Sequence, residues 1–399
     1  MAIPALTNRW VVLALLFFAR LVMALQFQSV PPLAPFLAHD LGLTFGQIGT
    51  LIGVYMFPGV LLALPGGLLG QRIGDKRAVL VSLALQTLGA LLFAFATSFP
   101  VALVGRLLGG VGVVMLNVQM IKMTTDWFAG REISTAMGIA LSAWPLGIAL
   151  ALSTLGVVAL ATSWHVAVLL TAVCSALSLA LVALLYRDPP AAGAGALSRR
   201  LWAISRAELA LIAVAGVVWM LANAGYIVFV GFAPALLIQR GIPVSAAGFL
   251  VGLASWISIG SVPLGGWLAD RLGRLDLFIV AGILANVVAI LLLSTGHAVA
   301  LWLVVFGLAL GLSPSAIMTL PAQVLSPLGR GTGFGVYYTI YYAGMAVFPP
   351  LAGRLVDTAH DARAALYLAA ALMGMTCVAL VVLRMMQRVL RLRGVPGVA

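Results

Sequence analysis

Residues 266–274 read Gly-Trp-Leu-Ala-Asp-Arg-Leu-Gly-Arg, a short run that places three charges between two long apolar stretches. The flanking stretches, 245–269 and 275–295, are each long enough for a helix that crosses a bilayer, which takes about 20 mostly apolar residues. Membrane barrel strands are alternating segments of about 10 residues, whereas these runs are longer and apolar on every face. The pattern is typical of a helical protein that crosses the membrane repeatedly.

The same loop pattern occurs 199 positions earlier in the chain. The pattern Gly-Gly-x4-Arg-x-Gly begins at Gly66 in the first half and at Gly265 in the second half. A shift of 199 residues also aligns the two halves without a gap from Pro35 to Gly74. Parallel repeats of this kind are typical of transporters that bind their substrate between the halves, near the bilayer midplane.

The composition excludes most classes of soluble protein. Only 8% of the 399 residues are charged and 63% are hydrophobic. Soluble globular proteins carry about 25% charged residues, because water solvates their surface. A soluble enzyme, a nucleic-acid-binding protein and a disordered scaffold are therefore all excluded.

Polar breaks divide the chain into twelve apolar stretches of membrane-spanning length. With both termini in the cytoplasm, 16 of the 22 lysines and arginines fall on the cytoplasmic side and three fall outside. This distribution follows the positive-inside rule, so the net charge of +12 indicates topology rather than nucleic-acid binding. The stretches are 10–37, 45–70, 78–97, 100–126, 133–160, 164–186, 208–238, 245–269, 275–295, 298–325, 332–355 and 363–386.

A polar segment, 187–207, separates the sixth stretch from the seventh. It contains Asp-Pro-Pro and Ala-Gly repeats, which are typical of a linker. We therefore predict an all-α integral membrane protein in which twelve transmembrane helices form two pseudo-symmetric six-helix bundles. The N-terminal bundle takes residues 1–186, the cytoplasmic linker 187–207 and the C-terminal bundle 208–399.

The loop at 266–274 resembles the cytoplasmic loop signature of the major facilitator superfamily, which reads Gly, three residues, Asp, Arg, any residue, Gly, Arg. The first copy keeps Gly67 and Arg72 but has Gln71 where the family has aspartate. The pattern Arg-x3-Gly-x-Gly from Arg106 resembles the family's fourth-helix motif. The resemblance implies the two-bundle fold and transport by alternating access, in which the loops close the cytoplasmic side.

The resemblance also implies a set of gating residues at these loops. An acid beside a helix N-terminus is stabilised by the helix dipole, and nearby cations can bind carboxylates across the gap between the bundles. The alternative is that these charges only set the topology. The expected gating residues are Arg72, Lys76, Asp126, Asp270, Arg271 and Arg274, with Asp126 as a partner for Lys76 or Arg77.

Three cations lie within the predicted spans, whereas all ten acids lie in loops or at helix ends. A charge inside the membrane costs about 2.5–3.5 kcal/mol on insertion scales, so it indicates a function. Arg20 lies close to the midplane, and Arg106 shares a helix face with Asn117. An anion from solution suits both arginines, because a guanidinium binds carboxylate or phosphate oxygens in a bidentate manner. The alternatives are structural roles for the arginines, while Lys122 pairs locally with Asp126.

The second half supplies polar side chains but no such cation. Tyr338 and Tyr342 lie four residues apart and therefore share one helix face. The alternative for these tyrosines is packing within the bundle or at the membrane interface. The predicted substrate-binding residues are Arg20, Arg106, Asn117, Asn223, Tyr226, Tyr338 and Tyr342.

The leading hypothesis is a secondary active transporter of a small organic or inorganic anion. The layout resembles cyanate-type and organic-anion members of the superfamily, whereas nitrate porters carry arginines in spans 2 and 8 that this chain lacks. The alternative is a drug or metabolite efflux antiporter, which normally needs a carboxylate inside the membrane. An intramembrane enzyme is excluded, because the four histidines lie in outer loops or at outer helix ends without an acid or nucleophile inside.

We expect a multi-pass monomer in the cell membrane, of the bacterial inner membrane type, with both termini in the cytoplasm. Its expected partners are a small-molecule substrate and the lipid bilayer, without nucleic acid. No phosphate-binding loop of the type Gly-x4-Gly-Lys-Ser/Thr occurs, so we expect no ATP site. No cofactor and no metal are expected either.

Overall fold

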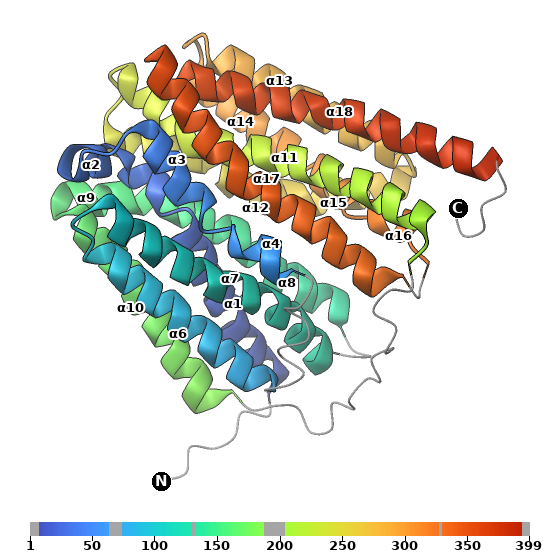
Figure 1. Cartoon of the computed structure of the whole chain (residues 1–399), viewed down its shortest axis with the longest axis horizontal. Helices are drawn as coiled ribbons and strands as arrows, with labels where there is room; N and C mark the ends of the chain where they lie inside the picture. Colours follow the sequence, from blue (N-terminus) through green and yellow to red (C-terminus); the bar gives the residue numbers. More distant parts are fainter. Residues whose placement is uncertain (1–7, 64–73, 129–131, 187–203, 327–328, 393–399) are drawn as a thin grey trace.

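The chain is helical throughout the part that the structure describes. The computed structural model describes residues 8–63, 74–128, 132–186, 204–326 and 329–392 (Figure 1). The first half contains α1 (Arg9–Phe27), α2 (Val30–Leu41), α3 (Phe45–Gly53), α4 (Pro58–Leu62), α6 (Asp75–Ala94), α7 (Phe99–Phe128), α8 (Ile133–Leu150), the π-helix η1 (Ala151–Leu155), α9 (Gly156–Ala161) and α10 (Trp164–Leu185). The second half contains α11 (Arg206–Gln239), α12 (Val244–Leu272), α13 (Leu275–Leu293), α14 (Val299–Leu310), α15 (Ser313–Ile317), α16 (Leu320–Val324), α17 (Arg330–Ala359) and α18 (Arg363–Leu392).

Eleven helical segments of the described chain are long and apolar enough to cross a membrane. The helix α17 is not among them, although it is 30 residues long and packs along α3 and α11. Its tyrosines, glycines and prolines lower its hydropathy. With α17 as the twelfth, these segments agree with the twelve spans expected from the sequence.

Three spans that the sequence predicted as continuous helices are broken in the structure. The first span consists of α1 and α2, because Pro31 and Pro32 have no N–H group to continue α1. The second span breaks between α3 and α4, just before Pro58. The tenth span is divided into α14, α15 and α16, and Pro314 and Pro321 stand in the first turns of the latter two.

The helices form two bundles that meet along several pairs of elements, among them α2 and α11. The helices α3 and α4 pack against α17, and α8 with η1 packs against α12. Figure 1 shows the bundles side by side where α3 meets the end of α17, and diverging from there towards the chain termini. We call the end formed by residues 44–46 and 353–357 the closed end. The segment 187–203, which contains most of the predicted linker, lies outside the described residues.

Main chains approach each other closely at the closed end because two glycines have no side chain. A Cβ atom at Gly49 would lie 2.1 Å from the main-chain oxygen of Pro349. One at Gly353 would lie 2.0 Å from the main-chain oxygen of Phe45. Any larger residue at either position would separate α3 from α17.

A carboxylate of the second bundle caps a helix of the first. The N–H groups of Phe45 and Gly46 each donate a 2.8 Å hydrogen bond to Asp357. Thr44 and Gln47 form a capping box at the same helix end, each side chain accepting from the other's main-chain N–H group. The main-chain N–H groups in the first turn of α3 therefore bond partly to the local cap and partly to the opposite bundle. The helix dipole also favours a carboxylate at this helix end.

We expect Asp357→Asn to loosen the closed end. Hydrogen bonds to charged groups contribute about 1.5–3 kcal/mol each, and the amide loses this charge while keeping the size of the side chain. Spin labels at His39→Cys and His297→Cys, exposed on different bundles at this end, would report the distance between the bundles. Cys174 and Cys377 would be replaced by alanine so that only the two introduced cysteines carry labels. The protein with Asp357 should then give one short distance between the labels, and Asp357→Asn should give an additional longer one.

Asp361→Asn is the matched control, because Asp361 pairs with Arg363 within the second bundle at the same end. It should leave the distance distribution unchanged. Distributions that are the same for Asp357→Asn and for this control would contradict a holding role for the Asp357 carboxylate.

Candidate functional site

Arg20 lies near the middle of α1 and bonds to α7 of the same bundle. Its Nη1 atom donates a 2.9 Å hydrogen bond to Asn117 Oδ1. The residue is 9% exposed, and its Nε atom is buried without a partner among the described residues. No described carboxylate lies within ion-pair distance of it. Arg20 therefore combines a buried positive charge with donor capacity that the protein leaves unused.

Tyrosines of α17 approach Arg20 from the other bundle. Tyr338, Tyr341 and Tyr342 lie in the electrostatic neighbourhood of Arg20. Tyr342 also interacts with the side chain of Asn117. The two bundles thus contribute complementary groups to one place, with a cation and an amide on one side and phenol rings on the other.

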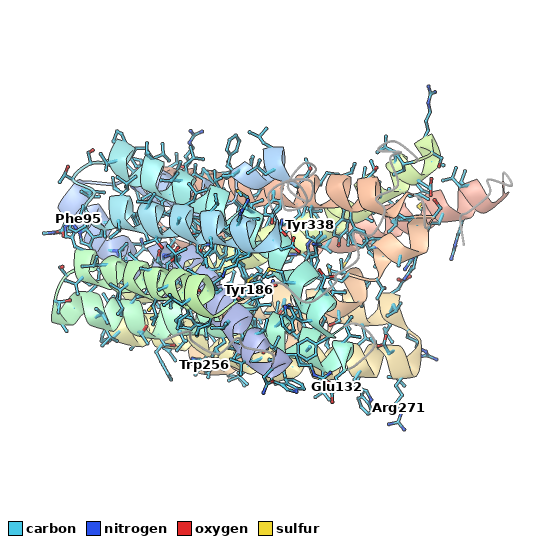
Figure 2. All side chains as sticks on the ribbon, turned by 90° about the horizontal axis from the view of Figure 1, so that it is seen from below. Phe95, Glu132, Tyr186, Trp256, Arg271 and Tyr338 are labelled. Atoms are coloured by element: carbon cyan, nitrogen blue, oxygen red, sulfur yellow. The ribbon has the colours of Figure 1, made fainter. Side chains whose placement is uncertain are left out.

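The site lies between the bundles and away from both ends of the molecule. Figure 2 places Tyr338 between the end marked by Phe95 and the end marked by Glu132. The ring of Tyr342 reaches across to α4, where a Cβ atom on Gly59 would lie 2.2 Å from it. Gly59 therefore leaves the space that this ring needs to approach α7.

The surroundings of Arg20 combine one cation with mostly apolar groups. A guanidinium in such surroundings binds an anion more strongly than it does in water, because the local dielectric constant is low. Its planar fork suits a carboxylate or another oxyanion. A pocket beside it is lined by Leu16, Arg20, Met120, Ile121, Thr124, Met137, Ala140 and Leu141.

Arg106, which the sequence predicted as a second substrate-binding arginine, is used by the fold instead. Its Nε atom donates to the main-chain oxygen of Leu51 at 2.9 Å. Its Nη1 and Nη2 atoms donate to the main-chain oxygens of Gln26 and Phe27, at 2.7 and 3.0 Å. The guanidinium also lies 3.9 Å from the centre of the Tyr55 ring. All three nitrogens are therefore engaged, and Arg106 has the structural role that the sequence left as the alternative.

The prolines after α1 explain why the carbonyl group of Phe27 needs a partner outside its own helix. In a continuous helix the oxygen of Phe27 would accept from the N–H group of residue 31, but Pro31 has none. The break between α1 and α2 therefore changes the partners of two buried carbonyl groups: that of Phe27 loses its helical donor, and that of Gln26 accepts from Ser29 instead. Arg106 of α7 donates to both and, through its bond to Leu51, ties α1, α3 and α7 together.

The two predicted site residues on α11 bond within the second bundle. Asn223 Nδ2 donates to the main-chain oxygen of Trp219 at 2.8 Å. The hydroxyl of Tyr226 lies 3.3 Å from Ser255 Oγ. No described contact joins either residue to Arg20. They share one face of α11 with Trp219, at spacings of four and seven residues.

The predicted gating residues of the first half bond within their own bundle. Arg72 lies outside the described residues. Lys76 Nζ donates to two main-chain oxygens at the end of α10, at 2.9 and 2.6 Å. Asp126 lies 3.7 Å from Lys122, which also pairs with Asp75. Asp126 is thus a partner of Lys122, and the expected pair between Asp126 and Lys76 is not formed.

The gating residues of the second half are exposed. Asp270, Arg271 and Arg274 all lie at the surface, and the guanidinium of Arg271 lies 5.2 Å from the centre of the Trp267 ring. Every ion pair between described residues joins groups of the same bundle. The expected latch is not formed among them, because the bundles diverge at this end.

Two rings near the site were absent from the predicted set. Tyr341 is close to Arg20, and its ring lies 6.1 Å from that of Trp219, centre to centre. The internal repeat contained a signal for Trp219, because Arg20 and Trp219 are 199 residues apart and so occupy equivalent positions. An aromatic residue in an apolar span, however, does not by itself indicate a binding site.

No described group of three or more His, Cys, Asp or Glu side chains is placed to hold a metal ion.

Comparisons with known proteins agree with this architecture. The family profile described as Major Facilitator Superfamily matches residues 16–349 and again 217–396. The chain is 28% identical over 363 residues to the 3-(3-hydroxy-phenyl)propionate transporter of Escherichia coli (strain K12), covering 86% of each. It is 28% identical over 159 residues to the hexuronate transporter of Bacillus subtilis (strain 168), covering 40% of this chain and only 38% of that transporter.

A solved structure resembles the whole chain. It is that of a bacterial homologue of the human lysosomal transporter Spinster, in an inward-facing and occupied conformation. The TM-score is 0.72 at 16% identity, and the match covers 95% of this chain and 96% of the other. At this identity the likeness concerns the fold alone, and it confirms the helical two-bundle fold expected from the sequence.

We expect Arg106→Lys to lower the unfolding temperature by several degrees. One ammonium group cannot bond simultaneously to the three carbonyl groups that the guanidinium bridges. A buried carbonyl group without a partner costs up to several kcal/mol where water cannot reach it. Tryptophan fluorescence of the detergent-purified protein during heating would measure the change.

Arg20→Lys is the control for this prediction, because Arg20 donates to one side chain and to no main-chain oxygen in the described structure. It should lower the unfolding temperature less than Arg106→Lys does. Equal unfolding temperatures for Arg106→Lys and the wild type would refute the structural role of Arg106.

Proposed function

The chain is a multi-pass membrane transporter that belongs to the major facilitator superfamily, and from this premise we propose that it carries a small anion that binds to Arg20. The observation that carries the proposal is the state of this arginine. It is buried between the bundles, bonds to a neutral amide and has a free Nε donor. A buried charge without a protein counter-ion is costly, so a bound anion would offset part of this cost.

The names of two curated relatives support an anion. Their names describe transporters of a hexuronate and of a substituted propionate, which are both carboxylates. A carboxylate would accept two parallel hydrogen bonds from a guanidinium. The Nε atom is one of the donors that such a bidentate arrangement can use.

A cationic substrate has less support. The efflux alternative normally requires a carboxylate inside the spans, and all ten acids of the chain lie in loops or at helix ends. The predicted midplane charge is instead positive. The anion proposal therefore explains Arg20, whereas the efflux alternative does not.

Orientation and mechanism follow from the proposed topology. With both termini in the cytoplasm, the closed end with Asp357 faces outward and the diverging ends face the cytoplasm. The site around Arg20 would then be reached from the cytoplasmic side, and transport would require the bundles to part at the closed end and approach at the other. Because one chain supplies groups from both bundles, we propose that the monomer is the transporting unit in the bacterial inner membrane.

We expect anions to stabilise the purified protein against heating and Arg20→Gln to abolish this effect. A panel of nitrate, acetate, benzoate, glucuronate and the cation tetraphenylphosphonium would be tested by thermal shift. A bound ligand raises stability according to its concentration relative to its dissociation constant. At least one anion should need a tenfold higher concentration, or fail altogether, with Arg20→Gln.

Arg274→Gln is the matched control, because Arg274 is exposed and forms no described ion pair. It removes the same charge and should leave the anion effects unchanged. Stabilisation by the cation alone, or anion effects that survive Arg20→Gln, would refute the proposal.

A further inference from the structure

We propose that Asn117 decides which charge the Arg20 site accepts. As a neutral amide it holds the guanidinium in place without supplying a counter-ion, so the positive charge of Arg20 is left for the ligand. This inference rests on the proposed function and names a residue that determines its specificity. The sequence predicted Asn117 as a direct contact of the substrate, whereas the role proposed here acts through Arg20.

The bond between the two residues occupies only part of the arginine. Arg20 Nη1 donates to Asn117 Oδ1 at 2.9 Å, and Arg20 Nε is buried without a partner among the described residues. A guanidinium has five N–H donors, and an amide oxygen accepts a hydrogen bond without carrying a negative charge. The bond therefore orients the guanidinium while its charge and its Nε donor stay available.

Another arginine of the same protein shows what an acid does in such a place. Arg384 of α18 lies beside Asp276 of α13, where its Nε atom donates to Oδ2 at 2.8 Å and its Nη2 atom bonds to Oδ1. The Nη1 atom of Arg384 donates to Gln323 and Gln387. All three nitrogens and the charge of Arg384 are thus used within the protein. The Nε donor that Asp276 occupies is the one that Arg20 keeps free.

An amide also offers Tyr342 something that a carboxylate lacks. The side chain of Asn117 interacts with Tyr342 of the second bundle, whose ring lies against α4 where a Cβ atom on Gly59 would be 2.2 Å away. With Oδ1 turned towards Arg20, the Nδ2 group is the part of the amide left to donate, and a carboxylate has no such donor. Asn117 therefore links groups of both bundles while adding no charge.

Asn117 shares its helix face with residues of the pocket beside Arg20. Met120, Ile121 and Thr124 follow it along α7 at spacings of three, four and seven residues, and all three line that pocket. The described residues that line the pocket include no acid. Arg20 therefore sets the charge of the pocket, and its partner at position 117 decides whether this charge is neutralised.

We expect Asn117→Asp to abolish the stabilisation of the purified full-length protein by anions. The new side chain has the same size, and a carboxylate at this distance from Arg20 would form an ion pair that competes with the ligand for the guanidinium. Thermal shift with nitrate, acetate, benzoate and glucuronate would measure the effect. The most effective of these anions should need at least a tenfold higher concentration with Asn117→Asp than with the wild type.

A neutral replacement separates the effect of charge from that of packing. Asn117→Leu has a similar volume, loses the bond to Arg20 and adds no charge. The same anion should stabilise it at less than fivefold the wild-type concentration, because one neutral hydrogen bond contributes about 1 kcal/mol. Asn117→Glu repeats the acid test if Asn117→Asp does not fold.

Asn8→Asp is the matched control for an added acid in the first bundle. Asn8 is exposed and caps α1 by accepting from the main-chain N–H group of Trp10, and aspartate caps a helix equally well. The control should leave the anion effects unchanged.

The outcomes separate this proposal from the proposed function. If the anion effects vanish with Arg20→Gln but survive Asn117→Asp, the anion proposal stands and the role of Asn117 is wrong. The same conclusion follows if Asn117→Leu loses the effects as completely as Asn117→Asp, since Asn117 would then bind the anion itself. If the cation tetraphenylphosphonium alone stabilises the wild type, both proposals fail.

Discussion

The bonds from the Arg106 guanidinium to three main-chain carbonyl groups are the interaction on which the first bundle depends. A bilayer provides no water for the backbone, so a helix that breaks within it must find other partners for its carbonyl groups. The prolines at the start of α2 cause such a break, and α7 supplies a donor to the Phe27 carbonyl group through one side chain, which also bonds to the main chain at Gln26 and Leu51. The break directs α2 towards α11, where Gln28 Nε2 lies 3.5 Å from the Val230 oxygen. It also leaves α3 facing α17.

Two arginines in the same bundle have different surroundings, and we propose different roles for them on that ground. Arg106 is 2% exposed and finds acceptors of fixed geometry on every side of its fork. Arg20 finds one amide oxygen, and the remaining groups near it are rings and aliphatic chains. A guanidinium with all donors satisfied stabilises a fold, whereas one with unused donors can bind a ligand. The two arginines therefore differ more in the number of satisfied donors than in burial.

The spans, the repeat and the position of Arg20 near the middle of its span could all be predicted from the sequence, because each depends on patterns of apolar and charged residues along the chain. It also placed Tyr338 and Tyr342 on one helix face. The structural role of Arg106 was open until the fold brought α7 beside the broken span, since the carbonyl groups it binds have no side-chain signature. The cap by Asp357 joins residues more than 300 positions apart and likewise leaves no local pattern. The repeat aligned Trp219 with Arg20, but only the three-dimensional structure showed that its ring packs against Tyr341.

The cap of α3 by Asp357 joins the bundles by a bond that water can replace. A main-chain N–H group released at the aqueous end of a helix is hydrated at once, and so is a released carboxylate, so that the net cost of exchange is far smaller than the strength of the bond in isolation. A contact of this kind can form and break reversibly. Glycine contacts such as that of Gly49 hold the two surfaces in register, while the hydrated ends allow them to part and to meet again without a large change in free energy.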